Sequence, residues 1–220
     1  MPTHIDHHAQ EAVTPQAAQS SQPAPTAVTA LRAPIEVHAP GHERTERLLL
    51  RPLRESDRAE FLRVICLSRE HLAEFAALHR PGESDEDLFA RQVARAEEGD
   101  RRATAWRRAA FLDDGRLVGC FNLHSIERGL RFEADANWWL AADQLGRGFA
   151  GEGLHALLAH ALRDLPRGLG LCRVRAMIAP DNAESRRVAL SCGMAPTGHR
   201  EILPVGSRWL PHDEFEITAR

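Results

Sequence analysis

Two residue types are missing from this sequence, and each absence excludes a kind of chemistry. The chain has 220 residues but no tyrosine and no lysine, so all 28 of its basic residues are arginine. Without lysine, the chain cannot form a Schiff base, use a lysine nucleophile or bind a nucleotide through a P-loop lysine. Without tyrosine, it has no phenol that could serve as a catalytic acid.

Long apolar runs, net charge and cysteine are limited too. No apolar run approaches the roughly 18 residues that a membrane-spanning helix needs, and the N-terminus lacks the basic start and apolar stretch of a secretory signal. The net charge of -3 argues against a direct nucleic-acid partner. We therefore expect a cytoplasmic protein with no membrane partner. No CxxC pair occurs, so we expect reduced thiols and no metal site from the four cysteines, Cys66, Cys120, Cys172 and Cys192.

Residues 1–40 differ in composition from the rest of the chain. They are rich in Ala, Pro and Gln and show neither a helical nor a strand period. Such a segment buries too little apolar area to offset its ordering entropy, so we predict a disordered tail. His4, His7 and His8 fit a solvated tail better than a metal cluster. The remaining residues, 41–220, are predicted to form one domain.

Hydrophobic periodicity and turn residues predict a mixed α/β fold with one sheet flanked by helices. Ser84 has the character of a helix N-cap, and Asp113-Asp114-Gly115 is typical of a hairpin turn. Strands are expected over 45–53, 104–112, 116–126, 133–140, 172–178, 194–201 and 214–218. Helices are expected from Ser56 through Leu72 and over 86–98, 151–164 and 185–192. The strands at 133–140 and 172–178 should be parallel, because a helix joins them.

The most informative segment is the glycine-rich turn after the strand that ends at Leu140. It contains Gly146, Gly148 and Gly151, and a helix is predicted to follow. Glycines let a ligand approach backbone N–H groups, and the positive end of a helix dipole favours a phosphate there. A dinucleotide fingerprint is excluded, because the turn comes late in the chain and the next strand runs into Ala179-Pro180 without a terminal acid.

The turn resembles the pyrophosphate loop of the GNAT family of N-acetyltransferases, whose pattern is Q/R-x-x-G-x-G/A. Gly148 and Ala150 match its fourth and sixth positions. The opening segment 45–53, the pair Trp138-Trp139 and the segment 181–194 resemble the branch that acetylates N-termini of ribosomal proteins. The resemblance implies a single-domain GNAT fold: a mixed, mostly antiparallel sheet of about seven strands. Its fourth and fifth strands form a splayed parallel pair that holds the cofactor.

The resemblance also implies acetyl-CoA as co-substrate, without a metal, and is compatible with a homodimer. The implied cofactor-binding residues are Leu140, Gly146, Arg147, Gly148, Phe149, Ala150, Asn182 and Ser185. Two residues depart from the family pattern. Leu145 replaces the expected Gln or Arg, with Gln144 one place early, and Gly153 replaces the usual Ala. Because the loop binds through backbone N–H groups, we expect weakened rather than abolished binding.

The chemistry requires an amine to attack a thioester, and hence an acid and a base. Ser185 matches the family serine that hydrogen-bonds the CoA sulfur, so the resemblance implies that it is the acid, with a helix cap as its alternative role. Asn182 matches a family residue that contacts the cofactor, and its alternative role is to shape a turn. Glu133 or Asp135 is the candidate base, acting through water.

An N-terminal α-amine, with a pKa near 7.7–8.0, is neutral far more often at pH 7 than a lysine amine. An N-terminal acceptor therefore needs little help from a base, and the resemblance to the ribosomal-protein branch implies a protein N-terminus as the acceptor. A small amine, such as an antibiotic or polyamine, and a non-catalytic acyl-CoA-binding module are the alternatives. The two neighbouring tryptophans, Trp138 and Trp139, should face opposite sides of their strand.

Overall fold

The computed structural model describes residues 41–76 and 78–219. The predicted tail, residues 1–40, lies outside the described residues, and so does its histidine cluster. Within the described part, eight strands form one sheet in the order β1-β2-β3-β4-β5-β6-β8-β7. In sequence order the strands are β1 (Glu43–Arg44), β2 (Leu49–Arg51), β3 (Trp106–Phe111), β4 (Leu117–Arg128), β5 (Phe132–Leu140), β6 (Arg173–Ile178), β7 (Ala195–Val205) and β8 (Arg208–Thr218).

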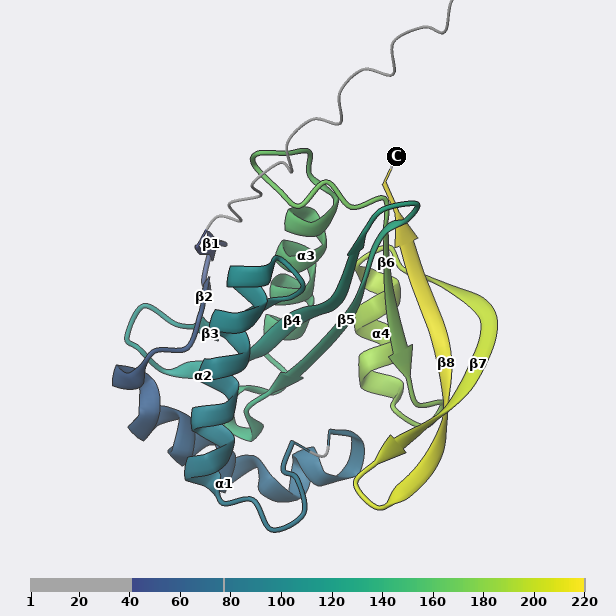
Figure 1. The fold of residues 1–220 in the computed structure, drawn as a ribbon. Coiled ribbons are helices and arrows are strands. Elements are labelled where there is room, and N and C mark those ends of the chain that lie inside the picture. The colour runs from purple at the N-terminus through teal and green to yellow at the C-terminus, as the bar shows by residue number, and fades with distance from the viewer. Residues whose placement is uncertain (1–40, 77, 220) are drawn as a thin grey trace, which may run out of the picture. The chain divides into compact units, whose positions relative to one another are not determined.

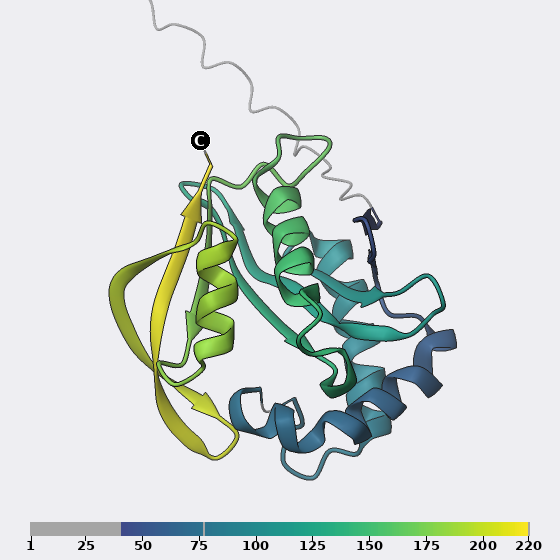
Figure 2. The same ribbon diagram turned by 180° about the vertical axis from the view of Figure 1, so that it is seen from behind.

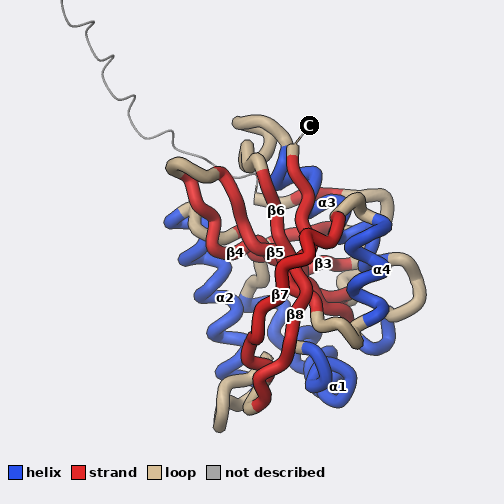
Figure 3. Tube along the Cα trace, turned by 90° about the vertical axis from the view of Figure 1, so that its right-hand side faces the viewer, coloured by secondary structure: helices blue, strands red, loops and turns tan. Residues whose placement is uncertain are grey.

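Two pairs of helices cover the sheet, one pair on each face (Figures 1 and 2). The helices are α1 (Arg58–Phe75), α2 (Asp85–Arg102), α3 (Phe149–Leu162) and α4 (Ala183–Ser191), and 3-10 turns lie at Glu55–Asp57 and Ala142–Gln144. Figure 3 shows the resulting three layers from the side, with α2 on one face of the strands and α3 and α4 on the other. This arrangement confirms the predicted α/β fold. The eighth strand is β1, a two-residue strand paired with β2.

Local sequence explains where the helices begin. The Ser84 side chain accepts a hydrogen bond from the Asp87 N–H at 3.1 Å, which caps α2 as predicted. Helix α1 buries Phe61, Ile65 and Leu72 on one face, as its helical spacing requires.

None of the helices in the described ranges is long and apolar enough to cross a membrane.

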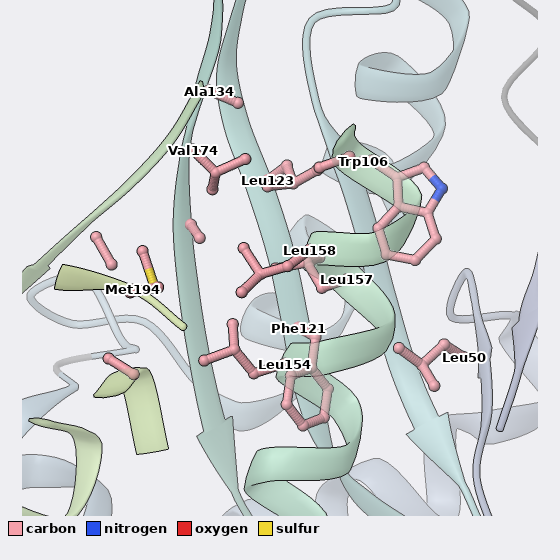
Figure 4. Packing of buried hydrophobic residues seen from close by; sticks show 14 of the residues in the cluster. Leu50, Trp106, Phe121, Leu123, Ala134, Leu154, Leu157, Leu158, Val174 and Met194 are labelled. Carbon is pink, nitrogen blue, oxygen red and sulfur yellow. The ribbon is translucent and has the colours of Figure 1, made fainter. Parts of the chain in front are cut away.

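Each face of the sheet has its own hydrophobic core. The larger core lies between the sheet and α3 with α4, and Figure 4 shows Leu154, Leu157 and Leu158 of α3 packed against it. The Phe121 ring of β4 packs beside α3, and a Cβ added to Gly153 would lie 2.2 Å from this ring. Gly153 departs from the family's alanine, and this contact explains why: the aromatic ring occupies the space that a methyl group would need.

The parallel pair β5 and β6 opens toward one end, and this opening positions the site. Only Glu133, Ala134 and Asp135 of β5 have partners on β6, although β5 continues to Leu140. Figure 1 shows the two strands diverging beyond their paired ends. The edge of residues 136–140 that faces β6 is therefore free of strand pairing in the described structure. The predicted splayed parallel pair is confirmed.

Candidate functional site

A cavity of about 720 Å³ lies where β5 ends, between the glycine turn, α4 and the end of α1. Its walls include all the predicted cofactor-binding residues except Arg147. The end of α1 supplies His71, Leu72, Glu74 and Phe75. The structure thus brings together residues from three separate segments, and the size of the cavity suits a large cofactor.

Backbone geometry of the glycine turn matches what an anion site requires. Gly146 and Gly148 both have positive φ, 71° and 80°, a conformation that favours glycine. A Cβ added to Gly146 would meet nothing within 4 Å, so open space lies over the backbone there. Within the described chain, the N–H groups of residues 146–151 donate no hydrogen bond. Together with the start of α3, they form a set of free donors for a phosphate.

Arg47, a residue that sequence reasoning did not single out, holds this turn in place. Its Nη1 donates to the Arg147 carbonyl at 3.0 Å, and its Nη2 lies 2.6 Å from the Glu152 carboxylate. The guanidinium also lies over the Phe149 ring, 4.6 Å from its centroid. Burial raises the pKa of Glu152, but hydrogen bonds from Thr45 and Arg47 outweigh it and hold this pKa below its usual value. Glu152 is therefore a charged anchor between the N-terminal segment and the turn.

We predict that Arg47→Ala weakens acetyl-CoA binding by about tenfold. The variant loses the hydrogen bond to the Arg147 carbonyl and the ion pair with Glu152. The ion pair adds little to the effect, because the Arg47 side chain is 45% exposed and solvent screens the charges. Calorimetric titration measures the affinity. Arg44→Ala is the matched control, because Arg44 forms an exposed ion pair with Asp113 away from the turn. Equal affinities in the two variants would show that Arg47 does not position the turn.

Gln144 and Leu145 lie at the place where this sequence departs from the family pattern. Leu145 lines the cavity and is 45% exposed, whereas Gln144 also lines it and is only 1% exposed. The Gln144 Oε1 atom is buried without a hydrogen-bond partner within the described residues. Gln144, which stands one position before the Gln or Arg of the family pattern, therefore does line the cavity.

Asn182 and Ser185 lie at the start of α4, where a second cavity meets the first. The Asn182 side chain accepts a hydrogen bond from the Ser185 N–H at 3.0 Å, so Asn182 is the helix cap. The Ser185 hydroxyl makes no hydrogen bond within the described residues. Its alternative role as a cap is therefore wrong, because Asn182 already fills that position.

The second cavity has a volume of about 260 Å³ and shares six lining residues with the first: Phe75, Ala76, Trp138, Trp139, Asn182 and Ser185. Its other lining residues are Leu78, Ala136, Asn137, Met177, Ile178, Ala179 and His212. This set contains no carboxylate and no arginine. Trp139 packs in the core with α1, and Trp138 packs against the opposite core, which confirms that they face opposite sides of β5.

Glu133, the candidate base, lies elsewhere. It is 4% exposed at the paired start of β5, far along the strand from Leu140, and lines neither cavity. Hydrogen bonds from Arg173 outweigh burial and hold the pKa of Glu133 below its usual value. Asp135 is paired with Arg175 at 3.1 Å and also lies outside the cavities. Glu133 lies at the start of β5 and forms ion pairs with Arg173 and Arg175, so its role there is structural. The structure does not bring Glu133 to the site.

Metal ligands are not grouped here. No cluster of three or more His, Cys, Asp or Glu residues suited to a metal occurs within the described residues. All four cysteines lie in the described part and are free thiols. The polar groups that line the two cavities are backbone N–H groups, the Ser185 hydroxyl, amides, histidines and, in the larger cavity, the carboxylates of Glu74 and Glu184.

Comparison with known proteins shows which family shares this sequence and fold. The model of the acetyltransferase (GNAT) domain matches residues 47–195. An uncharacterized N-acetyltransferase YoaA of Bacillus subtilis is 25% identical over 157 residues, which are 70% of this chain and 82% of that protein.

Two solved structures share the fold. Mycobacterium smegmatis RimJ, in complex with CoA-disulfide, matches with a TM-score of 0.70 at 23% identity, over 78% of this chain and 82% of that chain. Vibrio cholerae spermidine N-acetyltransferase, in complex with CoA and spermine, matches with a TM-score of 0.63 at 19% identity, over 79% and 96%. With the family model matching more than half of the sequence, the chain belongs to the acetyltransferase (GNAT) domain family and is an N-acetyltransferase.

Proposed function

We propose that this enzyme transfers the acetyl group of acetyl-CoA by direct attack to the N-terminal α-amine of a protein. The larger cavity holds the donor in this proposal, with the pyrophosphate on the free N–H groups of residues 146–151. The pantetheine arm lies along the unpaired edge of β5, which directs the thioester toward Ser185. The bound CoA of Mycobacterium smegmatis RimJ supports this choice of donor.

The choice of a protein N-terminus as the acceptor rests on the uncharged lining of the smaller cavity. A polyamine or aminoglycoside brings several positive charges, which require carboxylates for recognition. No carboxylate lines this cavity within the described residues, and its volume of about 260 Å³ suits one small side chain beside an amine. An α-amine is also neutral in about a tenth of molecules at pH 7, so it needs little help to become a nucleophile.

Acetyl-CoA turnover against an amine panel tests this function. The panel contains peptides that begin with Ala or Ser, the same peptides with blocked N-termini, a peptide with an internal lysine, and spermidine. We expect kcat/KM for a free N-terminus to exceed that for spermidine by at least about 100-fold, since two unpaired charges would be desolvated in the cavity. Blocked peptides should not react. A preference for spermidine would overturn the proposal.

A small-amine acceptor is the second candidate, and one observation favours it. Glu74 and Glu184 line the larger cavity, are exposed, and could attract a cationic substrate. The Vibrio cholerae relative that carries spermine has the same fold. The panel separates the two candidates by its ratio of peptide to polyamine turnover. We further propose a cytoplasmic location, which four free thiols support.

A further inference from the structure

We propose that His212 is the general base that takes the proton from the attacking amine. The inference rests on the proposed function only in that an amine must occupy the smaller cavity; it holds for either kind of acceptor. His212 lines that cavity together with Ser185 and is 8% exposed. Among the described residues that line the smaller cavity, His212 has the only side chain of a type that commonly acts as a general base, since the others are apolar side chains, amides and one hydroxyl.

Strand alternation turns His212 toward the cavity. The neighbouring Asp213 contacts Arg186 of α4 at 2.7 Å, and the Phe215 ring belongs to the core beneath α3 and α4. Side chains on a strand alternate between faces, so His212 points to the opposite face, where β5 and the end of α1 enclose the acceptor cavity. The register of β8, which pairs Asp213 with Ile178, sets His212 just beyond the last residue of β6.

A backbone hydrogen bond fixes the form of the ring. His212 Nδ1 lies 3.0 Å from the Leu210 carbonyl oxygen, and because a carbonyl only accepts, Nδ1 must carry the proton. In the neutral ring, Nε2 then holds a lone pair. The ring makes no other hydrogen bond within the described chain, so Nε2 is free to accept from a substrate. This combination of an anchored donor and a free acceptor is what a general base requires.

Charged groups around His212 are paired with other residues. Glu201, its partner in register on β7, contacts His199 at 2.9 Å, and Glu214 on the same face of β8 accepts a hydrogen bond from Thr197 at 2.9 Å. Asp213 is held on the other face. No carboxylate in the cavity competes for the amine proton, so the imidazole receives it.

The proposed step balances as follows. The amine lone pair attacks the thioester carbonyl, a C–N bond forms, and one amine proton moves to His212 Nε2. The C–S bond then breaks, and the leaving thiolate takes a proton from the Ser185 hydroxyl. That hydroxyl recovers its proton through solvent from the protonated His212. The products are the N-acetyl amine and free CoA, with no oxidant or metal involved.

The test is His212→Asn, because the asparagine amide can still donate to the Leu210 carbonyl while it removes Nε2. We expect kcat/KM for the amine to fall about 100-fold, with acetyl-CoA affinity and melting temperature nearly unchanged. At low pH, log kcat/KM should fall with a slope near two in the wild type, for amine and imidazole, and near one in the variant. His155→Asn is the matched control, because His155 is an exposed histidine of α3 that lines neither cavity.

The outcomes distinguish this inference from the proposed function. If the wild type acetylates spermidine instead of peptides, the same comparison is made with spermidine. A kcat/KM within about threefold of wild type, with slope two retained, would overturn the role of His212 while leaving the acceptor assignment intact. If the asparagine variant does not fold, His212→Gln is measured in its place with the same readouts.

Discussion

Replacing Gly148 by valine is expected to weaken acetyl-CoA binding by about 100-fold. Gly148 has a φ of 80° and precedes the first turn of α3, where the free N–H groups converge. A valine side chain would occupy the approach to these donors and would pull the backbone out of the left-handed conformation. Losing about two hydrogen bonds to a charged phosphate costs on the order of 3 kcal/mol, which corresponds to about 100-fold in affinity.

A control variant must separate the effect of backbone strain at residue 148 from the loss of the phosphate-binding site. Gly115, in the β3–β4 turn, has a φ of 85° and open space around it, so Gly115→Val imposes similar backbone strain away from the cavity. Both variants should melt at lower temperature, but only Gly148→Val should lose affinity in calorimetric titration. An affinity within about threefold of wild type in folded Gly148→Val would refute the assignment of the turn as the phosphate site.

Local signals in the sequence were enough to predict the order of the elements. Ser84 caps α2, Gly115 turns the β3–β4 hairpin, and the helical spacing of Leu154 and Leu158 marks α3. Each of these signals acts within a few residues, so the sequence alone reveals it. The glycine turn was found for the same reason, because strand, glycines and helix start are contiguous.

Contacts across long sequence distances could not be predicted in this way. Arg47 and Glu152 are 105 residues apart, and nothing local indicates that they meet. Glu133 appeared free for catalysis because its arginine partners, Arg173 above all, lie on another strand. His212 was missed because the last strand was predicted only from Glu214, whereas β8 begins at Arg208. Pro211 lies in the missed part, and proline disfavours strands because it lacks the N–H donor.

Ser185→Ala is expected to lower kcat by about 100-fold while acetyl-CoA affinity and melting temperature stay nearly constant. The hydroxyl lines both cavities and, within the described residues, is engaged by no other group. Asn182 caps α4, so the alanine variant keeps its helix start. A hydroxyl near the thioester sulfur matters most as negative charge develops on the departing thiolate. An interaction made only in the transition state lowers kcat and kcat/KM together.

The matched control is Ser191→Ala, which removes a hydroxyl from the other end of the same helix. The Ser191 hydroxyl donates to the Val188 carbonyl at 2.8 Å and lines neither cavity, so kcat should not change. Measuring kcat, acetyl-CoA affinity and melting temperature for both variants separates chemistry from folding. If kcat in Ser185→Ala stays within a fewfold of wild type, the thiolate leaves without this acid. A thiol with a pKa near 8.5 is already a fair leaving group, so the proton would then come from water.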